Sequence, residues 1–89
     1  MDNIFIVYAE NGSQNGWAAV EAESKNDAQE AAYNTGWLGG ASVTGIESWD
    51  EHIACSYIRF MTPEDLATLK RQILDGLEKE GFYELEWGS

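Results

Sequence analysis

The chain has 89 residues and a formal net charge of −11, which comes from 16 Asp and Glu against five Lys and Arg. This length suits a single domain, residues 1–89, and no segment approaches the roughly 20 apolar residues of a membrane span. The negative field repels nucleic acid and anionic membranes and attracts basic protein surfaces. A single cysteine, Cys55, excludes an internal disulfide, and the N-terminus has no signal-peptide pattern, so a cytoplasmic location is expected.

The first two elements are predicted to be strands that form a hairpin. Residues 4–9 are a continuous apolar run of β-forming types, which predicts a central strand buried on both faces. A polar turn at residues 11–16 precedes residues 17–23, in which the side chains alternate between two faces. This second strand is therefore expected to be half-exposed.

A helix is predicted next, because Ser24 and Asp27 form an S-x-x-D capping box and Gly36 lies where a helix ends. Its inner face carries small residues, which permit close packing on a sheet. The glycine-rich loop that follows carries Trp37 and Leu38, whose bulky apolar side chains are expected to cap the core.

The middle of the chain is predicted to contain two further strands. Residues 43–49 are a plausible third strand that Gly45 weakens, and residues 50–52 are a polar turn. Residues 53–60, with the sequence IACSYIRF, are then predicted to form a fourth strand.

A long amphipathic helix is the clearest element of the sequence. Thr62 is its predicted N-cap, Pro63 fits its first position and Gly81 lies at its end. Its apolar stripe must be covered by the rest of the chain, and it is formed by Leu66, Leu69, Ile73, Leu74 and Leu77. Residues 82–87 alternate well and form either a last edge strand or an ordered tail.

These elements give the order ββαββα, with or without a last strand. Runs of strands with two helices on one face indicate an α+β fold, a single-domain two-layer sandwich with a mostly antiparallel sheet. We find no internal repeat, no linker and no low-complexity segment.

The sequence offers no catalytic machinery and no cofactor or metal site. His52 and Cys55 are the candidates for nucleophilic chemistry, but three residues apart in a strand they would point to opposite faces. The simpler interpretation is a surface histidine and a small buried cysteine. Glu47, Asp50 and Glu51 could hold a hard cation, but no calcium-loop motif is present.

Aromatic residues flanked by acids suggest a partner-binding surface instead. A ring supplies buried area, and the acids supply steering and specificity toward a basic protein. The alternative is that both tryptophans belong to the core, and that the acidity serves only solubility. The predicted partner-binding residues are Trp17, Glu21, Glu23, Glu47, Trp49, Asp50 and Glu51.

A resemblance adds to this interpretation. The segment Val20–Ala32 (VEAESKNDAQEAA) runs a strand into a capped, alanine-faced helix, and Val43–Glu47 (VTGIE) follows it. This resembles the β–α–β layout of small phage-encoded proteins, including some anti-CRISPR inhibitors of Cas complexes, over roughly residues 4–49. The resemblance implies a DNA-mimicking inhibitor in the host cytoplasm, and it carries over no catalytic residue.

Three hypotheses for the function follow. The favoured one is a non-enzymatic inhibitor that binds a basic, nucleic-acid-binding protein complex, such as a CRISPR effector, and competes with DNA in its positively charged channel. The second is a homo-oligomeric structural or adaptor protein of phage or bacterial origin, for example a homodimer. The third is a small enzyme or metal-binding protein, which would require a perturbed carboxylate pair or a bound metal.

Overall fold

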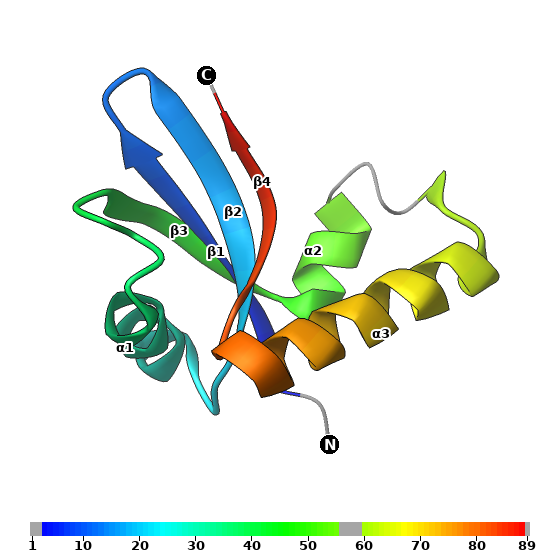
Figure 1. The fold of residues 1–89 in the computed structure, drawn as a ribbon. Coiled ribbons are helices and arrows are strands. Elements are labelled where there is room, and N and C mark those ends of the chain that lie inside the picture. The colour runs from blue at the N-terminus through cyan, green and yellow to red at the C-terminus, as the bar shows by residue number, and fades with distance from the viewer. Residues whose placement is uncertain (1–2, 56–59, 89) are drawn as a thin grey trace.

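In the computed structural model, which describes residues 3–55 and 60–88, a four-stranded antiparallel sheet lies between helices (Figure 1). The described elements are, in order, β1 (Ile4–Asn11), β2 (Gln14–Glu21), α1 (Lys25–Thr35), β3 (Ser42–Ser48), α2 (Trp49–Cys55), α3 (Pro63–Glu80) and β4 (Tyr83–Gly88). The predicted α+β class with an antiparallel sheet is confirmed. The predicted order ββαββα is not confirmed, because a short helix occupies residues 49–55, where a turn and the start of a fourth strand were predicted.

The sheet has the strand order β3-β1-β2-β4, and all of its neighbouring strands are antiparallel. β1 is therefore central, as predicted, and pairs with β2 through a tight hairpin in which Ile6 lies opposite Ala19. On its other side, Val7 of β1 lies opposite Ile46 of β3. β4 pairs with β2 and is an edge strand, which confirms the strand alternative for residues 82–87.

The helices cover opposite faces of this sheet (Figure 1). One core cluster joins α1 and the loop after it to one face, and consists of Val7, Ala9, Val20, Ala28, Ala32, Leu38 and Ala41. The second cluster joins α2 and α3 to the other face, and consists of Ile4, Ile6, Ala19, Trp49 and Ile73. The predicted two-layer sandwich is therefore wrong: successive residues of β1 point to opposite faces and both sets are apolar, so each face needs its own cover.

The prediction that the second strand is half-exposed is wrong for the same reason, because both faces of the sheet are covered. Ala18, Ala19 and Val20 are all fully buried, although they alternate between the two faces of β2. β2 lies between β1 and β4 and under a helix on each side, so this stretch is buried rather than half-exposed.

The predicted bounds of α1 and α3 are confirmed by their caps. The Ser24 hydroxyl accepts a hydrogen bond from the Asp27 N–H at 3.2 Å, and Thr62 caps α3 in the same way. Gly36 and Gly81 end the two helices in the left-handed conformation, with φ of 79° and 83°. The predicted apolar stripe of α3 packs against the second core cluster, with Ile73 fully buried. Among the described residues, no helix is long and apolar enough to cross a membrane.

The loop after α1 helps to attach β4. Leu38 is buried in the first core cluster and Trp37 packs against it, which confirms their predicted capping role. The Trp37 indole N–H donates to the Glu84 carboxylate at 2.9 Å, and its ring meets Trp87 edge to face at 5.9 Å. Two side chains of β4 therefore contact a loop that is far from them in the sequence.

The helix α2 replaces the predicted turn at residues 50–52 and the first part of the predicted strand at residues 53–60. Residues 56–59 of that strand lie outside the described residues. A reciprocal cap begins α2: the Glu51 carboxylate accepts the Ser48 N–H at 2.8 Å, and the Ser48 hydroxyl accepts the Glu51 N–H at 3.2 Å. This is the S-x-x-E capping box, which lies in the sequence as Ser48-Trp49-Asp50-Glu51.

Replacing Ser48 by alanine is expected to lower the free energy of unfolding by about 1 kcal/mol, because the first turn of α2 loses its side-chain acceptor. Urea unfolding followed by tryptophan fluorescence measures this change. Ser42→Ala, at the exposed start of the same strand, is the control and should stay within about 0.5 kcal/mol of the unmodified chain. Equal losses in the two variants would mean that the cap does not stabilise the fold.

Candidate functional site

One end of the sheet gathers acidic side chains from three segments. Because the strands are antiparallel, the start of β1 lies beside the ends of β2 and β3: Ile4 pairs with Glu21, and Phe5 pairs with Ser48. The loop before α1 and the first turn of α2 extend from this end. The structure thus brings four of the predicted partner-binding residues to one place, which we call the acidic end: Glu21, Glu23, Asp50 and Glu51.

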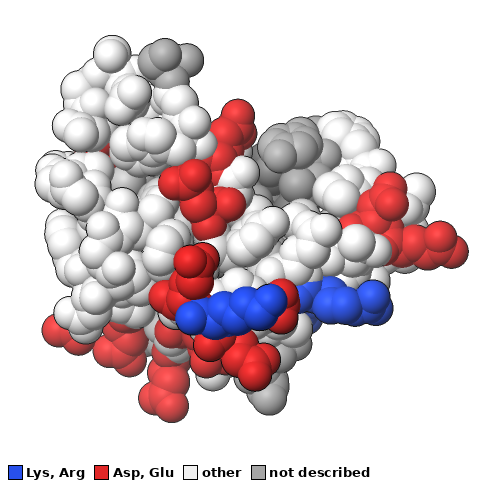
Figure 2. Space-filling model, viewed as in Figure 1, with Lys and Arg blue, Asp and Glu red and all other residues white. Residues whose placement is uncertain are grey.

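The four acidic side chains are all exposed. Figure 2 shows acidic groups gathered along the lower edge of the molecule, beneath α1 and the sheet, whereas the basic side chains visible on this face lie over α3. Acidic groups therefore predominate at this end of the sheet, with Lys25 among them. Such a surface raises the local concentration of a basic partner and speeds its association.

Glu51 differs from the other three acids because it has structural partners. The Ser48 backbone N–H and the Lys25 ammonium group, whose Nζ lies 3.3 Å from Oε1, hold the pKa of the Glu51 carboxyl below its ordinary value. The side chains of Lys25 and Glu51 are 55% and 50% exposed, so this ion pair contributes little to stability. Glu51 keeps its negative charge, but part of that charge is balanced by Lys25.

Two of the other predicted partner-binding residues are tryptophans on the α2–α3 face of the sheet. Trp49 belongs to the second core cluster and exposes 9% of its surface. Trp17 is half-buried against the same cluster, and its ring lies 5.6 Å from the ring of Tyr8. The sequence left open whether these residues face solvent or the core, and the structure places both against the core. Their predicted contact with a partner stays a prediction.

The seventh residue, Glu47, belongs to a polar cluster that the sequence did not reveal. Its Oε1 lies 2.5 Å from the Tyr8 hydroxyl and 2.8 Å from Nδ1 of His52. The Tyr8 hydroxyl and His52 Nδ1 are themselves 2.9 Å apart. Three elements, β1, β3 and α2, therefore meet at one triangle of polar atoms, and the residues concerned are separated by up to 44 positions in the sequence.

Glu47 Oε1 is the common acceptor of this cluster. It accepts a hydrogen bond from the Tyr8 hydroxyl, and it accepts a second one from His52 in the tautomer that carries its hydrogen on Nδ1. His52 is 2% exposed, and its Nδ1 has two hydrogen-bond partners here, the Glu47 carboxylate and the Tyr8 hydroxyl, which offset the cost of burying it. In the described part of the chain, no buried side-chain nitrogen or oxygen lacks a hydrogen-bond partner. The cluster thus attaches α2 to the sheet.

The burial of His52 corrects the prediction of a surface histidine. The prediction assumed a strand entry at residues 52–55, but this segment is helical, and α2 turns His52 inward between Tyr8 and Trp49. The argument that His52 and Cys55 point to opposite faces fails for the same reason, and the Cys55 side chain lies outside the described part of the structure. No group of three or more His, Cys, Asp or Glu in the described residues is arranged to hold a metal ion.

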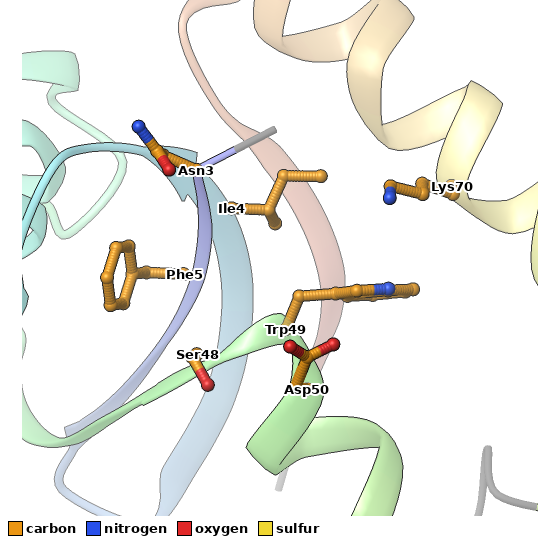
Figure 3. Close-up of a pocket in the computed structure, with 7 residues that line it drawn as sticks. All are labelled: Asn3, Ile4, Phe5, Ser48, Trp49, Asp50 and Lys70. Atoms are coloured by element: carbon orange, nitrogen blue, oxygen red, sulfur yellow. The ribbon is translucent and has the colours of Figure 1, made fainter. Parts of the chain in front are cut away.

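A pocket of about 460 Å³ opens beside the acidic end (Figure 3). Trp49 and Asp50 contribute to it from the first turn of α2, Ile4 from β1, and Lys70 from α3. In the view of Figure 3 the Trp49 indole lies between the Lys70 ammonium group and the Asp50 carboxylate. The remaining lining residues are Asn3, Phe5 and Ser48.

The chain matches no protein-family model, no curated protein and no solved structure.

Proposed function

We propose that the chain is a non-enzymatic acidic inhibitor, which binds a basic, nucleic-acid-binding protein through its acidic end and blocks the nucleic-acid site of that protein. The observation that carries the proposal is the convergence of Glu21, Glu23 and Asp50, all exposed, at one end of the sheet. Glu21 and Glu23 lie in one stretch of the chain and Asp50 lies in another, so the fold brings the two stretches together. A rigid array of carboxylates can compete for side chains that otherwise contact phosphates.

The class of partner follows from the charge and from the resemblance. A net charge of −11 disfavours binding of the chain to nucleic acid or to an anionic membrane, and favours a protein with a positively charged channel. CRISPR effector complexes hold nucleic acid in such channels. The proposed setting is the host cytoplasm, the proposed interaction is between proteins, and it requires no cofactor.

Neutralising Glu21, Glu23 and Asp50 together should weaken inhibition about tenfold. The variant is Glu21→Gln, Glu23→Gln, Asp50→Asn, which keeps the shape of each side chain. Three exposed charge pairs at about 0.5 kcal/mol each give about 1.5 kcal/mol, or roughly a factor of ten in affinity. The measurement is the chain concentration that half-displaces fluorescent target DNA from a panel of purified CRISPR effector complexes, at low and at high salt.

The matched control is Glu10→Gln, Glu78→Gln, Glu80→Gln. It removes the same amount of charge from exposed positions on β1 and α3. Glu47 and Glu51 stay unchanged in both variants, because each stabilises the fold through its own hydrogen bonds. Equal inhibition by the two variants would mean that net charge, rather than the acidic end, is responsible. Failure of the unmodified chain to displace DNA from any complex of the panel would reject this partner class.

A second candidate function, a homo-oligomeric structural or adaptor protein, is favoured by a different observation. Within the described residues, β3 and β4 each end the sheet and have one edge that pairs with no other strand. Such edges can pair with a second copy of the chain. A stable dimer whose mass does not change with salt, together with no displacement of DNA, would favour this function over the inhibitor.

A further inference from the structure

The outer edge of β4 is bordered by aromatic and acidic side chains on both faces of the sheet. We propose that this edge receives an extended segment of the partner that carries two consecutive basic residues. The segment would lie beside β4 and add a strand to the sheet. This inference rests on the proposed function, because it specifies which part of the basic partner the chain recognises.

β4 offers backbone groups along one of its sides. It is an edge strand of six residues, and in the described part of the chain β2 is its one neighbouring strand (Figure 1). The N–H and C=O groups on its outer side can therefore form a ladder with another extended chain. β4 begins opposite Ala19, two residues before Glu21 on β2, so this edge starts next to the acidic end and one partner can reach both surfaces.

A β-bulge places the two glutamates of β4 on opposite faces of the sheet. Glu84 and Glu86 are two residues apart, so in a regular strand both side chains would lie on one face. The register shifts between them, and they lie opposite Ala18 and Trp17, which are consecutive on β2. A carboxylate therefore borders the outer edge on each face, and both glutamates are exposed.

A tryptophan accompanies each of these carboxylates. On the α1 face, the Glu84 carboxylate accepts the Trp37 indole N–H at 2.9 Å, and Trp87 meets Trp37 edge to face. On the α2–α3 face, Glu86 and Trp17 line a pocket of about 180 Å³. The three tryptophans are half-buried, so each is held by the core and keeps part of its ring at the surface. A basic side chain can pair with a carboxylate and stack on such a ring.

The placement of the two acids selects the sequence of the added strand. Successive residues of an extended chain point to opposite faces, so two consecutive basic residues would meet one glutamate on each face. Trp17 and Ala18 show this arrangement on the inner side of β4. Basic residues two positions apart lie on the same face, so one of them reaches a glutamate and the other does not. The partner segment is therefore expected to contain two neighbouring lysines or arginines.

The same charges disfavour a second copy of the chain at this edge. Pairing of two β4 strands would bring Glu84 and Glu86 of one copy beside the same residues of the other, and like charges opposite each other destabilise a strand pair. The exposed residues of β3, at the other edge, are Ser42 and Thr44, which carry no charge, so that edge does not select a basic strand. The charged edge of β4 thus rejects itself and admits a basic segment.

The direct test titrates two hexapeptides of the same composition into the ¹⁵N-labelled chain. Ac-TVKKVT-NH₂ has its lysines side by side, whereas Ac-TKVKVT-NH₂ has them on one face. We expect the first peptide to bind about twofold to threefold more tightly, because it makes one more exposed charge pair. Its binding should shift the indole N–H resonances of Trp17 and Trp37, assigned with the variants Trp17→Phe and Trp37→Phe. It should also slow hydrogen exchange of the outward-pointing amides of β4 and leave the exchange of the β3 amides unchanged.

Variants then test which carboxylates are responsible. Glu86→Gln removes the acid on the α2–α3 face, so the two lysine peptides should bind this variant with equal affinity. Glu30→Gln, at an exposed position of α1, is the matched control and should keep the difference between the peptides. The neutral peptide Ac-TVQQVT-NH₂ should bind the unmodified chain about fivefold less tightly than Ac-TVKKVT-NH₂, because both charge pairs are lost.

Four outcomes would overturn the proposal. Equal affinity of the two lysine peptides for the unmodified chain would show that the placement of the acids does not select the segment. Slower exchange in β3 instead of β4, or indole shifts without slower exchange in β4, would show that the peptide does not pair along this edge. A doubled mass of the chain, with the outward-pointing amides of β4 protected before peptide is added, would assign the edge to a second copy. The absence of a saturable shift with any peptide would remove the site.

The outcome is distinguishable from that of the proposed function. If Ac-TVKKVT-NH₂ does not bind but the Glu21/Glu23/Asp50 variant loses inhibition, the acidic end acts without strand addition and only this inference fails. If the peptide binds as described but the chain displaces DNA from no effector complex, the edge of β4 is a binding site and the proposed partner class is wrong.

Discussion

Replacing Glu47 by alanine is expected to lower the free energy of unfolding by about 2 kcal/mol. The change removes the carboxylate that the Tyr8 hydroxyl and Nδ1 of the buried His52 both contact, whereas these two groups stay 2.9 Å apart and can bond to each other. A buried polar group that loses its partner costs about 1–3 kcal/mol, and more when charge is involved. The change also weakens the attachment of α2 to the sheet, since the Glu47 side chain joins β3 to α2.

Urea unfolding followed by tryptophan fluorescence measures this loss, and Glu47→Gln is its matched control. Glutamine keeps the length of the side chain and one oxygen acceptor, so we expect it to cost only about 1 kcal/mol, the difference between a charged and a neutral acceptor. Glu10→Ala removes an exposed acid from β1 and should cost less than about 0.5 kcal/mol. A Glu47→Ala variant as stable as Glu10→Ala would show that the cluster does not hold α2 in place.

The double variant Glu47→Ala, His52→Leu provides a sharper test of the cause. If Glu47→Ala destabilises the fold because buried His52 loses its carboxylate partner, replacing His52 should restore part of the stability. The loss in free energy of unfolding of the double variant should then be smaller than the sum of the losses of the two single variants. Strict additivity would place the cost of Glu47→Ala elsewhere, for example in lost packing of its side-chain stem.

The sequence predicted the two longer helices well because both of their ends carry local signals. Ser24 and Thr62 each provide a hydroxyl to the backbone three residues later, and Gly36 and Gly81 each take a left-handed conformation. These signals act within one turn of helix, so no tertiary information is needed to interpret them. The bounds of α1 and α3 follow from such residues alone.

The short helix α2 was missed although its capping box is present. Ser48 is both the last residue of β3 and the residue that caps α2, so it belongs to two patterns at once. Residues 53–60 contain isoleucine, phenylalanine and tyrosine, which favour a strand, and a helix of seven residues is too short to show a clear apolar period. Packing of Trp49 and His52 against the sheet decides the outcome.

The layering could have been predicted from β1 alone. A central strand whose two faces are both apolar requires a cover on each side, and one helix cannot cover both. The acidic end follows from the same topology, because antiparallel strands bring Glu21 and Asp50 to one end of the sheet. The Tyr8–Glu47–His52 cluster does not follow from any local pattern, because its members meet only after three elements have packed.

Replacing Gly16 by alanine is expected to lower the free energy of unfolding by about 3 kcal/mol. Gly16 is buried on β2, where it pairs with Trp87 of β4. An added Cβ would collide with the carbonyl oxygen of Glu86 and lie 2.5 Å from Cε3 of the Trp87 ring. A carbonyl oxygen of the backbone cannot move away without opening the ladder between β2 and β4, so relief of this overlap costs strand pairing as well as strain.

Gly45→Ala is the matched control, since Gly45 also lies within a strand but a Cβ there would have no heavy atom within 4 Å. Gly45→Ala should change the free energy of unfolding by less than about 1 kcal/mol, and it can raise this free energy because alanine restricts the unfolded chain.

Hydrogen exchange separates the two ways in which Gly16→Ala can act. Faster exchange confined to the amides of β4 would mean that the edge strand detaches while β1, β2 and β3 stay paired, whereas faster exchange throughout would mean that β4 is needed to hold α3 on its face of the sheet. A Gly16→Ala variant as stable as Gly45→Ala would contradict the close approach of β4 to β2 on which this prediction depends.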